Sequence, residues 1–371
     1  MVTQPSGPSA QALRIETTVS AERWPALRAF LATHYRPDLA LLWKPLFDWQ
    51  YQARPDGGGA CMLSAWSEQR LVGILGYAPV PSFWGTLTEA VPAAWAMNWM
   101  VDPSYRMGIG WLLMRKLHDM HPVLTSVDAS ADNVRLVEPL GWKVFTTLPR
   151  YVLVLDAASA REKFGLAGAI AEAPRIESHE ALRDVRAADG TYRPNWPKYG
   201  PMRYGAVRSL AHLEWRYLRH PRFTYHVVAT GAPDRPAVAV YRVELAFDAA
   251  GHDVAPVARV VEFFHPHDAQ GRLDAAALLA GLAARLRRDG CVFADTWMSS
   301  GCYGATLVEC GWCRERSEQP LLPSRLAPVQ QLPRNLNFEI GVRRPFTMPA
   351  GDDTYITRGD SDADRPSMLA A

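Results

Sequence analysis

Apolar and polar residues alternate along this chain with two periods, one typical of helices and one typical of strands. In the first half the pattern predicts, in chain order, a helix at 21–35, strands at 61–66, 71–78 and 93–101, a helix at 109–120, a strand at 123–128, a helix at 132–140 and a long strand at 142–155. The second half predicts strands at 223–229, 237–245 and 257–264, a helix at 274–287, a strand at 291–296 and a strand after Gly311. This order predicts an α/β fold with mixed sheets and helices on both faces of each sheet.

The two halves also share short sequence segments. Four pairs recur in the same order: RIE at 14–16 and 175–177, YRP at 35–37 and 192–194, Trp49, Tyr51 and Pro55 echoed by Trp215, Tyr217 and Pro221, and LVEPLGW at 136–142 echoed by LVECGW at 307–312. Each match is weak alone, but their common order indicates a duplicated domain. We therefore predict a first copy at 12–156, a linking helix or loop at 157–171, a second copy at 172–330 and a C-terminal tail at 331–371.

Composition excludes several classes of protein. The chain is 48% hydrophobic and 21% charged with a formal net charge of +2, which indicates a globular protein and gives no basic footprint for nucleic acid. No apolar run reaches the roughly 18–20 residues of a membrane span, and the N-terminus lacks the regions of a signal peptide. The protein is expected to be cytoplasmic.

Cysteine spacing does not favour a metal site. Four of the five cysteines lie close together in the second half, at Cys291, Cys302, Cys310 and Cys313. A zinc site would need two compact ligand pairs, and only the last two have that spacing. We therefore interpret these residues as small apolar side chains at a strand edge and expect no metal.

A glycine-containing stretch, YRMGIGWLLMRKL at 105–117, follows a predicted strand and begins a predicted helix. Free backbone N–H groups and the helix dipole meet at such a point, so the stretch can hold a phosphate group. Neither the Walker pattern nor the third glycine of the dinucleotide pattern is present. On its own, therefore, the stretch fits a structural turn as well as a phosphate site.

The surrounding order of strand, glycine loop, helix, strand, helix and LGW resembles the GNAT superfamily of acyl-CoA-dependent acyltransferases, of the tandem two-copy type. The residues that carry this resemblance are Pro103, Tyr105, Arg106, Gly108, Ile109 and Gly110, followed by Leu140, Gly141 and Trp142. Two departures are visible. The loop is one residue shorter than usual, and Val137 stands where the family often has a tyrosine that protonates the departing thiolate.

The resemblance implies a binding site for acetyl-CoA or another acyl-CoA in the first copy. The residues it assigns to that site are Val101, Arg106, Met107, Gly108, Ile109, Gly110 and Trp111. In the second copy the corresponding loop, HPHDAQGRLD at 265–274, lacks Gly-x-Gly. The resemblance therefore implies that the second copy shapes the acceptor site.

Four residues at strand ends are candidates for the chemistry. Asn98 could polarise a group or position a water molecule, although it also suits a strand residue with local hydrogen bonds. Asp128 ends the strand predicted at 123–128, where an acceptor amine would approach, and is the candidate acid or base; its alternative role is capping of the next helix. Glu262 and His265 lie at the matching strand end of the second copy and could face a shared cleft, or be satisfied locally.

The tail sequence TYITRGDSDADRP, at 354–366, alternates aspartates as the start of a calcium loop does, but lacks the later glycine and glutamate. A disordered acidic tail is one interpretation. The other is that Arg358, Asp360 and Asp362 fold over the cleft and bind acceptor hydroxyl groups. Such endings resemble those of tandem GNAT proteins that modify bacterial surface sugars.

These observations favour an N-acyltransferase that moves an acetyl or other short acyl group to an amino sugar, possibly nucleotide- or lipid-linked, in polysaccharide assembly. A peptidyl transferase of the FemABX type is an alternative, although the near-neutral charge suits a tRNA-bound substrate poorly. A non-catalytic acyl-CoA-binding protein is a third hypothesis, because Val137 replaces the usual acid.

Overall fold

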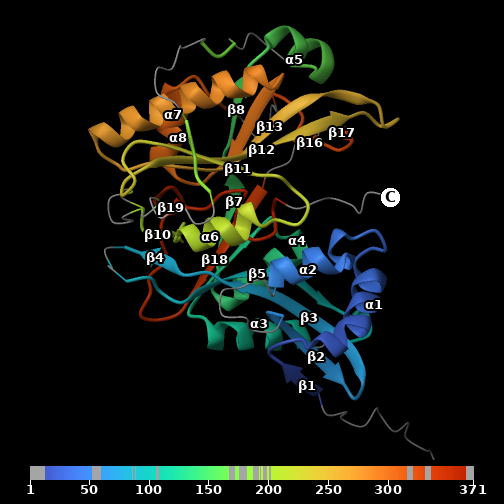
Figure 1. Cartoon of the computed structure of the whole chain (residues 1–371). Helices are drawn as coiled ribbons and strands as arrows, with labels where there is room; N and C mark the ends of the chain where they lie inside the picture. The colour runs from blue at the N-terminus through green and yellow to red at the C-terminus, as the bar shows by residue number, and fades with distance from the viewer. Residues whose placement is uncertain are drawn as a thin grey trace, which may run out of the picture.

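A computed structural model describes residues 13–51, 60–85, 87, 89–105, 108–166, 172–174, 182–186, 192, 194, 199, 202–315, 321–330 and 336–364. Its described residues form two seven-stranded mixed sheets, joined by a small sheet of three strands. In Figure 1 the sheet built mainly from the first half lies below the sheet built mainly from the second half.

The first sheet has the strand order β1-β2-β3-β5-β6-β18-β7. Its strands are β1 (Leu13–Glu16), β2 (Met62–Ser67), β3 (Arg70–Pro79), β5 (Ala93–Val101), β6 (Val123–Val127), β18 (Leu336–Val342) and β7 (Lys143–Leu148). The helices of this half are α1 (Trp24–His34), α2 (Lys44–Tyr51), α3 (Ile109–Met120) and α4 (Ala131–Val137). Residues of α1 and α2 share one core cluster with Ile74 of β3, whereas α3 shares another with Leu75, so helices cover both faces.

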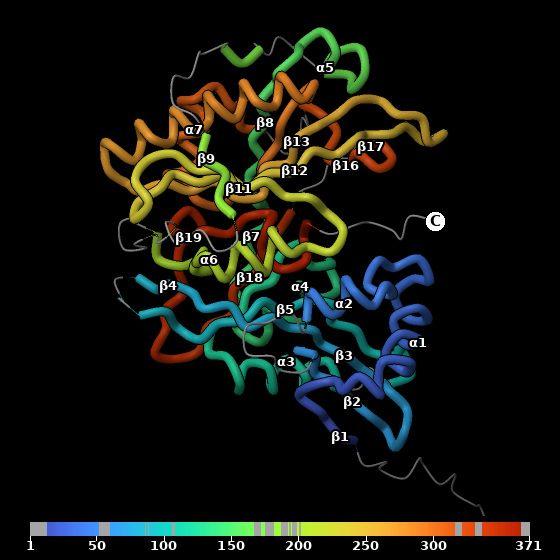
Figure 2. Tube along the Cα trace, viewed as in Figure 1, coloured from blue at the N-terminus to red at the C-terminus, as the bar shows by residue number. Residues whose placement is uncertain are grey.

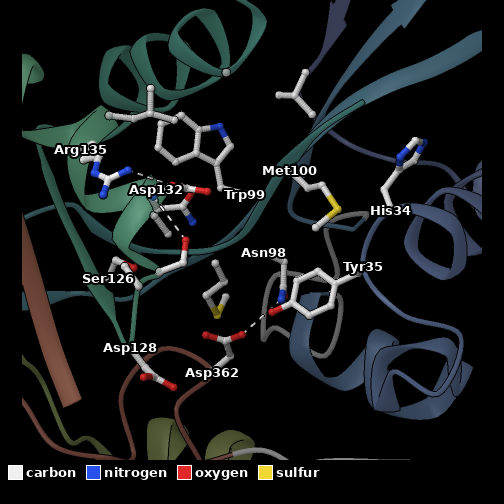
Figure 3. A pocket seen from close by; sticks show the side chains of 18 of the residues that line it. His34, Tyr35, Asn98, Trp99, Met100, Ser126, Asp128, Asp132, Arg135 and Asp362 are labelled. Atoms are coloured by element: carbon white, nitrogen blue, oxygen red, sulfur yellow. Dashed lines mark hydrogen bonds and ion pairs between the residues drawn. The ribbon is translucent and has the colours of Figure 1, made fainter. Parts of the chain in front are cut away.

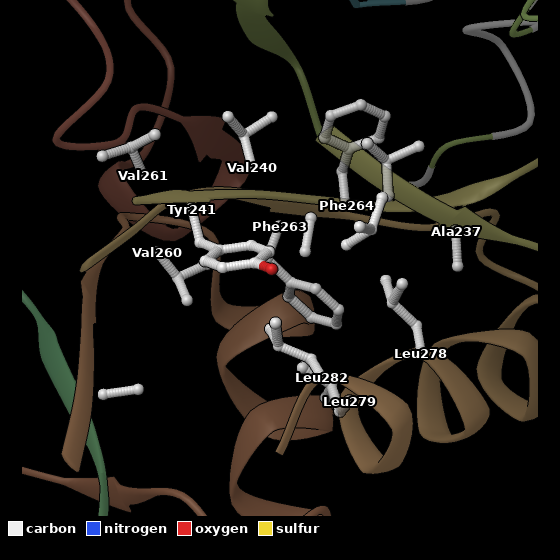
Figure 4. Close-up of a cluster of buried hydrophobic side chains, with 14 of the residues drawn as sticks. Ala237, Val240, Tyr241, Val260, Val261, Phe263, Phe264, Leu278, Leu279 and Leu282 are labelled. Atoms are coloured by element: carbon white, nitrogen blue, oxygen red, sulfur yellow. The ribbon is translucent and has the colours of Figure 1, made fainter. Parts of the chain in front are cut away.

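The second sheet has the order β15-β8-β14-β13-β12-β11-β9. Its strands are β15 (Cys313–Arg314), β8 (Arg150–Val154), β14 (Phe293–Trp297), β13 (Asp253–Phe264), β12 (Ala237–Phe247), β11 (His226–Thr230) and β9 (Arg183–Asp184). Its helices include α5 (Ala157–Phe164), α6 (Leu210–Leu213), α7 (Ala269–Arg288) and α8 (Gly301–Glu309). Leu278, Leu279 and Leu282 of α7 pack on the β12–β13 hairpin at helical spacing, as Figure 4 shows.

The two sheets exchange one strand each. After β7 the chain passes Pro149 and leaves the first sheet, because β8 pairs with β14 and β15 of the second. In return β18, near the C-terminus, lies between β6 and β7 of the first sheet. When the first sheet is read from β1 and the second sheet from β9, the two strand orders correspond position by position. In this comparison β18 of the first sheet takes the position of β8 in the second. In Figure 2 the β18 label lies in the lower body, among the labels of the first-half strands.

This exchange changes two expectations. The long strand predicted at 142–155 is wrong: it is two strands in different sheets, separated at Pro149. Residues predicted as tail supply β18 as well as β19 (Thr354–Tyr355), which pairs with β10 (Tyr204–Ala206) and, through it, with β4 (Ser82–Trp84). The domain limits at 156, 172 and 330 stay a prediction, and the sheets share strands across them.

The repeated tryptophans contact each other. Trp49 lies in α2 and Trp215 in η6 (Glu214–Leu218), a π-helical turn. The indole Nε1 of Trp49 donates to the carbonyl oxygen of Trp215 at 2.7 Å, and Nε1 of Trp215 donates to that of Trp49 at 3.0 Å. Such a reciprocal pair is what a two-fold relation between two copies produces, which supports duplication.

Two further residues follow the same relation. Tyr51 donates its hydroxyl to Asn98 on β5, and Tyr217, the repeat partner of Tyr51, donates to Glu262 on β13 at 2.5 Å. Asn98 and Glu262 therefore occupy matching places, because β5 and β13 are each the fourth strand when the two sheets are read from β1 and from β9. The amphipathic pattern missed α2 and α8, whose apolar residues are interrupted by small and polar ones.

A chain that ends after Gln330 tests the importance of the exchanged strand. Without β18, strands β6 and β7 lose their shared neighbour, so the first sheet should not form and the truncated chain should lose its cooperative thermal unfolding and near-ultraviolet circular dichroism. The matched control ends after Asp364 and keeps every described strand. Equal melting of the two chains would contradict a structural role for β18.

Candidate active site

A cleft opens where β5 and β6 separate. The two strands pair in parallel only from Ala93 and Val123 to Trp95 and Thr125. Beyond these pairs the strands enclose a cavity of about 1010 Å³. Residues of β5, of β6 and its following loop, of α3, of α4 and of the tail line it together, and Figure 3 shows most of their side chains.

The glycine loop forms one wall of this cavity. Gly108 caps the N-terminus of α3 with φ of 87°, a conformation that glycine adopts without strain. A Cβ added there would meet no atom within 4 Å, so the space beside the loop is open. A Cβ on Gly110 would instead lie 3.2 Å from the ring of Trp99, which explains the second glycine. The first N–H groups of the twelve-residue α3 lack helical partners and can bind an anion.

The predicted cofactor residues divide into three groups. Val101, Gly108, Gly110 and Trp111 line the cavity. Ile109 does not; its side chain is buried in the core beneath α3. Arg106 and Met107 lie outside the described residues. The loop at Gly108 and Gly110, with the first N–H groups of α3, therefore forms a phosphate cradle that fits the phosphate end of a CoA.

Asn98 lies at a bulge in β5. The register between β3 and β5 shifts opposite this residue, and its φ of 49° lies in the left-handed region. Its amide oxygen accepts from Tyr51 and from Nε2 of Gln50 at 3.3 Å, while its amide nitrogen donates to Asp362 at 3.2 Å. These bonds hold the side chain in one orientation at the cavity wall.

Asp128 lines the same cavity directly after β6. It too has a positive φ, 61°, and its N–H donates to the carbonyl oxygen of Asn337 at 2.9 Å. The alternative role of capping α4 belongs to Ser130, whose hydroxyl accepts from the N–H of Asn133 at 3.3 Å. Asp128 is thus held in a strained backbone conformation at the site, a feature common at functional residues.

Glu262 and His265 do not line the cavity. Glu262 is fully buried and accepts from Arg208 at 2.8 Å, Tyr217 at 2.5 Å and Tyr355 at 2.6 Å. Nδ1 of His265 lies 2.8 Å from the carbonyl oxygen of Pro266, and its Nε2 lies 3.0 Å from Thr306 Oγ1. Burial lowers the pKa of His265 to about 4, so it is neutral at pH 7.

The tail fills the matching cleft of the second copy. The pairing of β13 with β14 ends at Val260 and Thr296. Beyond this point the tail backbone takes over: the N–H of Ser299 donates to the carbonyl oxygen of Ile356 at 2.9 Å, and the N–H of Arg358 donates to that of Trp297 at 3.2 Å. The described tail residues 351–364 are therefore packed, contrary to the disordered interpretation.

The three candidate tail residues are placed differently. Asp362 lines the first-copy cavity. Asp360 is fully buried, with both carboxylate oxygens 2.9 Å from Nη2 of Arg208. Arg358 is 3.2 Å from Asp364 and lies over the ring of Trp297. Of the three, Asp362 alone reaches the cavity.

Several lining residues carried no sequence signal. They include Ser126, Asn133 and Arg135, together with His34 and Tyr35. Tyr35 belongs to the repeated YRP segment, which gave a signal of duplication but not of function. Among the described lining residues the carboxylates are Asp128, Asp132 and Asp362, and the one arginine is Arg135.

Comparison with known proteins agrees with this geometry. Residues 24–122 match the family model of the acetyltransferase (GNAT) family. No curated protein matches the chain. Among solved structures, a GCN5-related N-acetyltransferase from Anabaena variabilis aligns over 89% of this chain and 72% of its own, with 15% identity and a TM-score of 0.53. One from Kribbella flavida covers 89% and 70%, with 14% identity and a TM-score of 0.50.

A further solved structure is also similar in fold. N-myristoyltransferase from Saccharomyces cerevisiae, solved with bound myristoyl-CoA, aligns over 92% of this chain and 80% of its own, with 10% identity and a TM-score of 0.51. The two seven-stranded mixed sheets agree with the α/β fold of two GNAT-like sheets that the sequence predicted. Residues 24–122 therefore match the acetyltransferase (GNAT) family, and the solved structures extend the likeness in fold to about 90% of the chain.

The part of the chain that the structure describes has neither a cluster of metal-ligating side chains nor a membrane-spanning helix. It contains no group of three or more His, Cys, Asp or Glu placed to hold a metal ion, and its cysteines form no disulfide. No helix in that part is long and apolar enough to span a bilayer.

The variant Gly108→Glu tests the phosphate cradle. A carboxylate at this position would project into the open space beside the α3 amides, so we expect CoA affinity to fall at least tenfold in isothermal titration calorimetry. Gly251→Glu is the matched control, because Gly251 also has a positive φ, 85°, and open space, but lies outside the cavity. Unchanged affinity in a folded Gly108→Glu variant would contradict the assignment.

Proposed function

We propose that the protein transfers an acetyl or other short acyl group from acyl-CoA to a primary amine, and that transfer takes place in the first-copy cleft. One observation carries this proposal: the separation of β5 and β6 and the N-terminus of α3 open into the same cavity. A long thioester can then lie with its phosphates at α3 and its acyl end between the strands.

The residues fit this co-substrate. Gly108 leaves open space for phosphates, and the α3 amides supply donors. Beyond Trp95 the edge of β5 that faces β6 makes no further ladder pairs with β6, so N–H groups on that edge are available to a pantetheine chain and to a thioester oxygen. When bound, acyl-CoA supplies an activated acyl group; the protein has to orient it, exclude water and manage protons.

The acceptor end favours a cationic amine. Asp128 and Asp362 approach the cavity from β6 and from the tail, and Figure 3 shows Asn98 bonded to Asp362 there. Two carboxylates attract an ammonium group and can take its proton before attack. Asp128 is the proposed base, and Asn98 positions the Asp362 carboxylate.

We further propose that the acceptor is an amino sugar of a cell-surface polysaccharide. The cavity wall offers hydrogen-bonding side chains, among them Ser126 and Asn133, that suit a substrate rich in hydroxyl groups. Acetyl-CoA with a panel of amino sugars and other primary amines tests this proposal. Tight acetyl-CoA binding with no transfer to any amine would favour a non-catalytic acyl-CoA-binding protein.

The variant Asp362→Asn tests the acceptor site. Loss of the negative charge should lower kcat/KM for the amine about tenfold or more, because one charge-assisted hydrogen bond is lost, and leave acetyl-CoA affinity unchanged. Asp353→Asn serves as control, since Asp353 is a half-exposed aspartate of the same tail whose side chain lies 3.8 Å from Arg203. A variant with wild-type kcat/KM would exclude Asp362 from acceptor binding.

A further inference from the structure

A buried glutamate lies behind the wall of the cavity. Glu339 is in the exchanged strand β18 and is fully buried. In the register of β6 and β18 it lies opposite Ser126, so the two side chains share one face of the sheet. Neither carboxylate oxygen of Glu339 makes a hydrogen bond of good geometry.

This carboxyl differs from several other buried carboxylates that the structure describes. Glu262 pairs with Arg208, Asp295 with Arg150 and Asp364 with Arg242. No ion pair of this kind involves Glu339 among the described residues. A buried carboxyl without a cation keeps its proton, because burial penalises the charged form.

The groups that face Glu339 also favour its protonated form. Asp128, directly after β6, adds negative charge that opposes ionisation of Glu339, and the Ser126 hydroxyl weakly favours the ionised form. Gly341 lies two residues after Glu339 and on the same face of β18. A Cβ at Gly341 would collide with Trp142 and with His118 of α3, so these two side chains pack against this face. Burial lowers the pKa of His118 to about 4, so it is neutral and offers no cation. Mainly through burial, the pKa of Glu339 is raised to about 8.

Ser126 connects this carboxyl to the cavity. The last β5–β6 pair is Trp95 with Thr125, so Ser126 is the first residue of β6 beyond the point of separation, and it lines the cavity. An acyl group held between the strands would lie beside this wall. Val137, the last residue of α4, is buried and has no hydroxyl group that could protonate a departing thiolate.

We propose that Glu339 stores the proton that the leaving thiolate takes up and delivers it through the Ser126 hydroxyl. As the amine nitrogen bonds to the acyl carbon and the carbon–sulfur bond breaks, Ser126 gives its hydroxyl proton to the sulfur and receives one from Glu339. The products are an amide and CoA thiol. The proton lost by the amine passes to Asp128 and then to solvent, from which Glu339 is reprotonated. Glu339 acts through Ser126 and is a positioning residue for the proton. The inference rests on the proposed function.

The first test does not require activity. Glu339 keeps its proton in the folded protein up to about pH 8 but loses it near its ordinary value of 4.5 when unfolded. Raising the pH between these values therefore favours the unfolded state of the wild type. Glu339→Gln has no such dependence, so its melting temperature should gain on the wild type from about pH 5 to pH 8 and then keep a constant lead. A constant difference across this range would overturn the protonated state of Glu339.

The second test measures thiol release from acetyl-CoA with hydroxylamine as a small amine probe, after the rate of the spontaneous reaction without protein is subtracted. Glu339→Gln and Ser126→Ala should each lower kcat at least tenfold, with the KM for acetyl-CoA within about twofold. Ser126→Thr keeps a hydroxyl and should retain most of the rate. The wild-type rate should fall as the pH rises above about 8, and this alkaline fall should be absent from Glu339→Gln. Glu138→Gln, an exposed carboxylate on η4 (Glu138–Leu140), is the control.

The outcomes separate the two proposals. A wild-type protein that binds no acetyl-CoA or releases no thiol contradicts the proposed function. A working wild type whose Glu339→Gln variant has the same rate and pH profile overturns only the role of Glu339. Ser126→Ala should keep the wild-type pH dependence of melting, because Glu339 is intact; a slow Glu339→Gln beside a fully active Ser126→Ala would overturn the route through Ser126.

Discussion

The reciprocal exchange of β8 and β18 is the constraint on which the rest of this molecule depends. Each sheet takes an inner strand from the other half of the chain, so each is incomplete without it. Because backbone N–H and C=O groups of inner strands need partners on both sides, the exchange ties the two hydrophobic cores into one structure. The contact of Trp49 with Trp215 adds a second bond across the same interface.

The two related halves have different contents in their matching clefts. In the first, β5 and β6 separate around a cavity. In the second, the tail occupies the separation of β13 and β14, and Arg208 binds Glu262 and Asp360 where an open cleft would otherwise expose them. A buried ion pair costs desolvation free energy, so its value here is better understood as fixing the path of the tail than as adding stability. That path brings Asp362 to the first cavity.

Local sequence patterns predicted most of what depends on neighbours in the chain. β5, the glycine loop and α3 could be identified from the sequence, because apolar periodicity and the turn at Gly108 depend only on residues close to one another in the chain. The strand exchange could not be predicted from the sequence. Pro149 separates β7 and β8, which have similar apolar content, and no residue in 142–155 indicates which sheet each strand joins. Ser126 and Glu339 are equally invisible, because they meet only through the pairing of β6 with β18, and Asp362 reaches the cavity only because the tail is anchored at Arg208.

The long sequence separation of β18 from β6 and β7 has a consequence during synthesis. The ribosome releases β6 and β7 roughly two hundred residues before the strand that joins them, and folding of large proteins proceeds as segments emerge. Until residue 342 has left the exit tunnel, both strands present open edges able to pair with other chains. Completion of the cavity wall, with Glu339 behind Ser126, therefore waits until β18 has been synthesised.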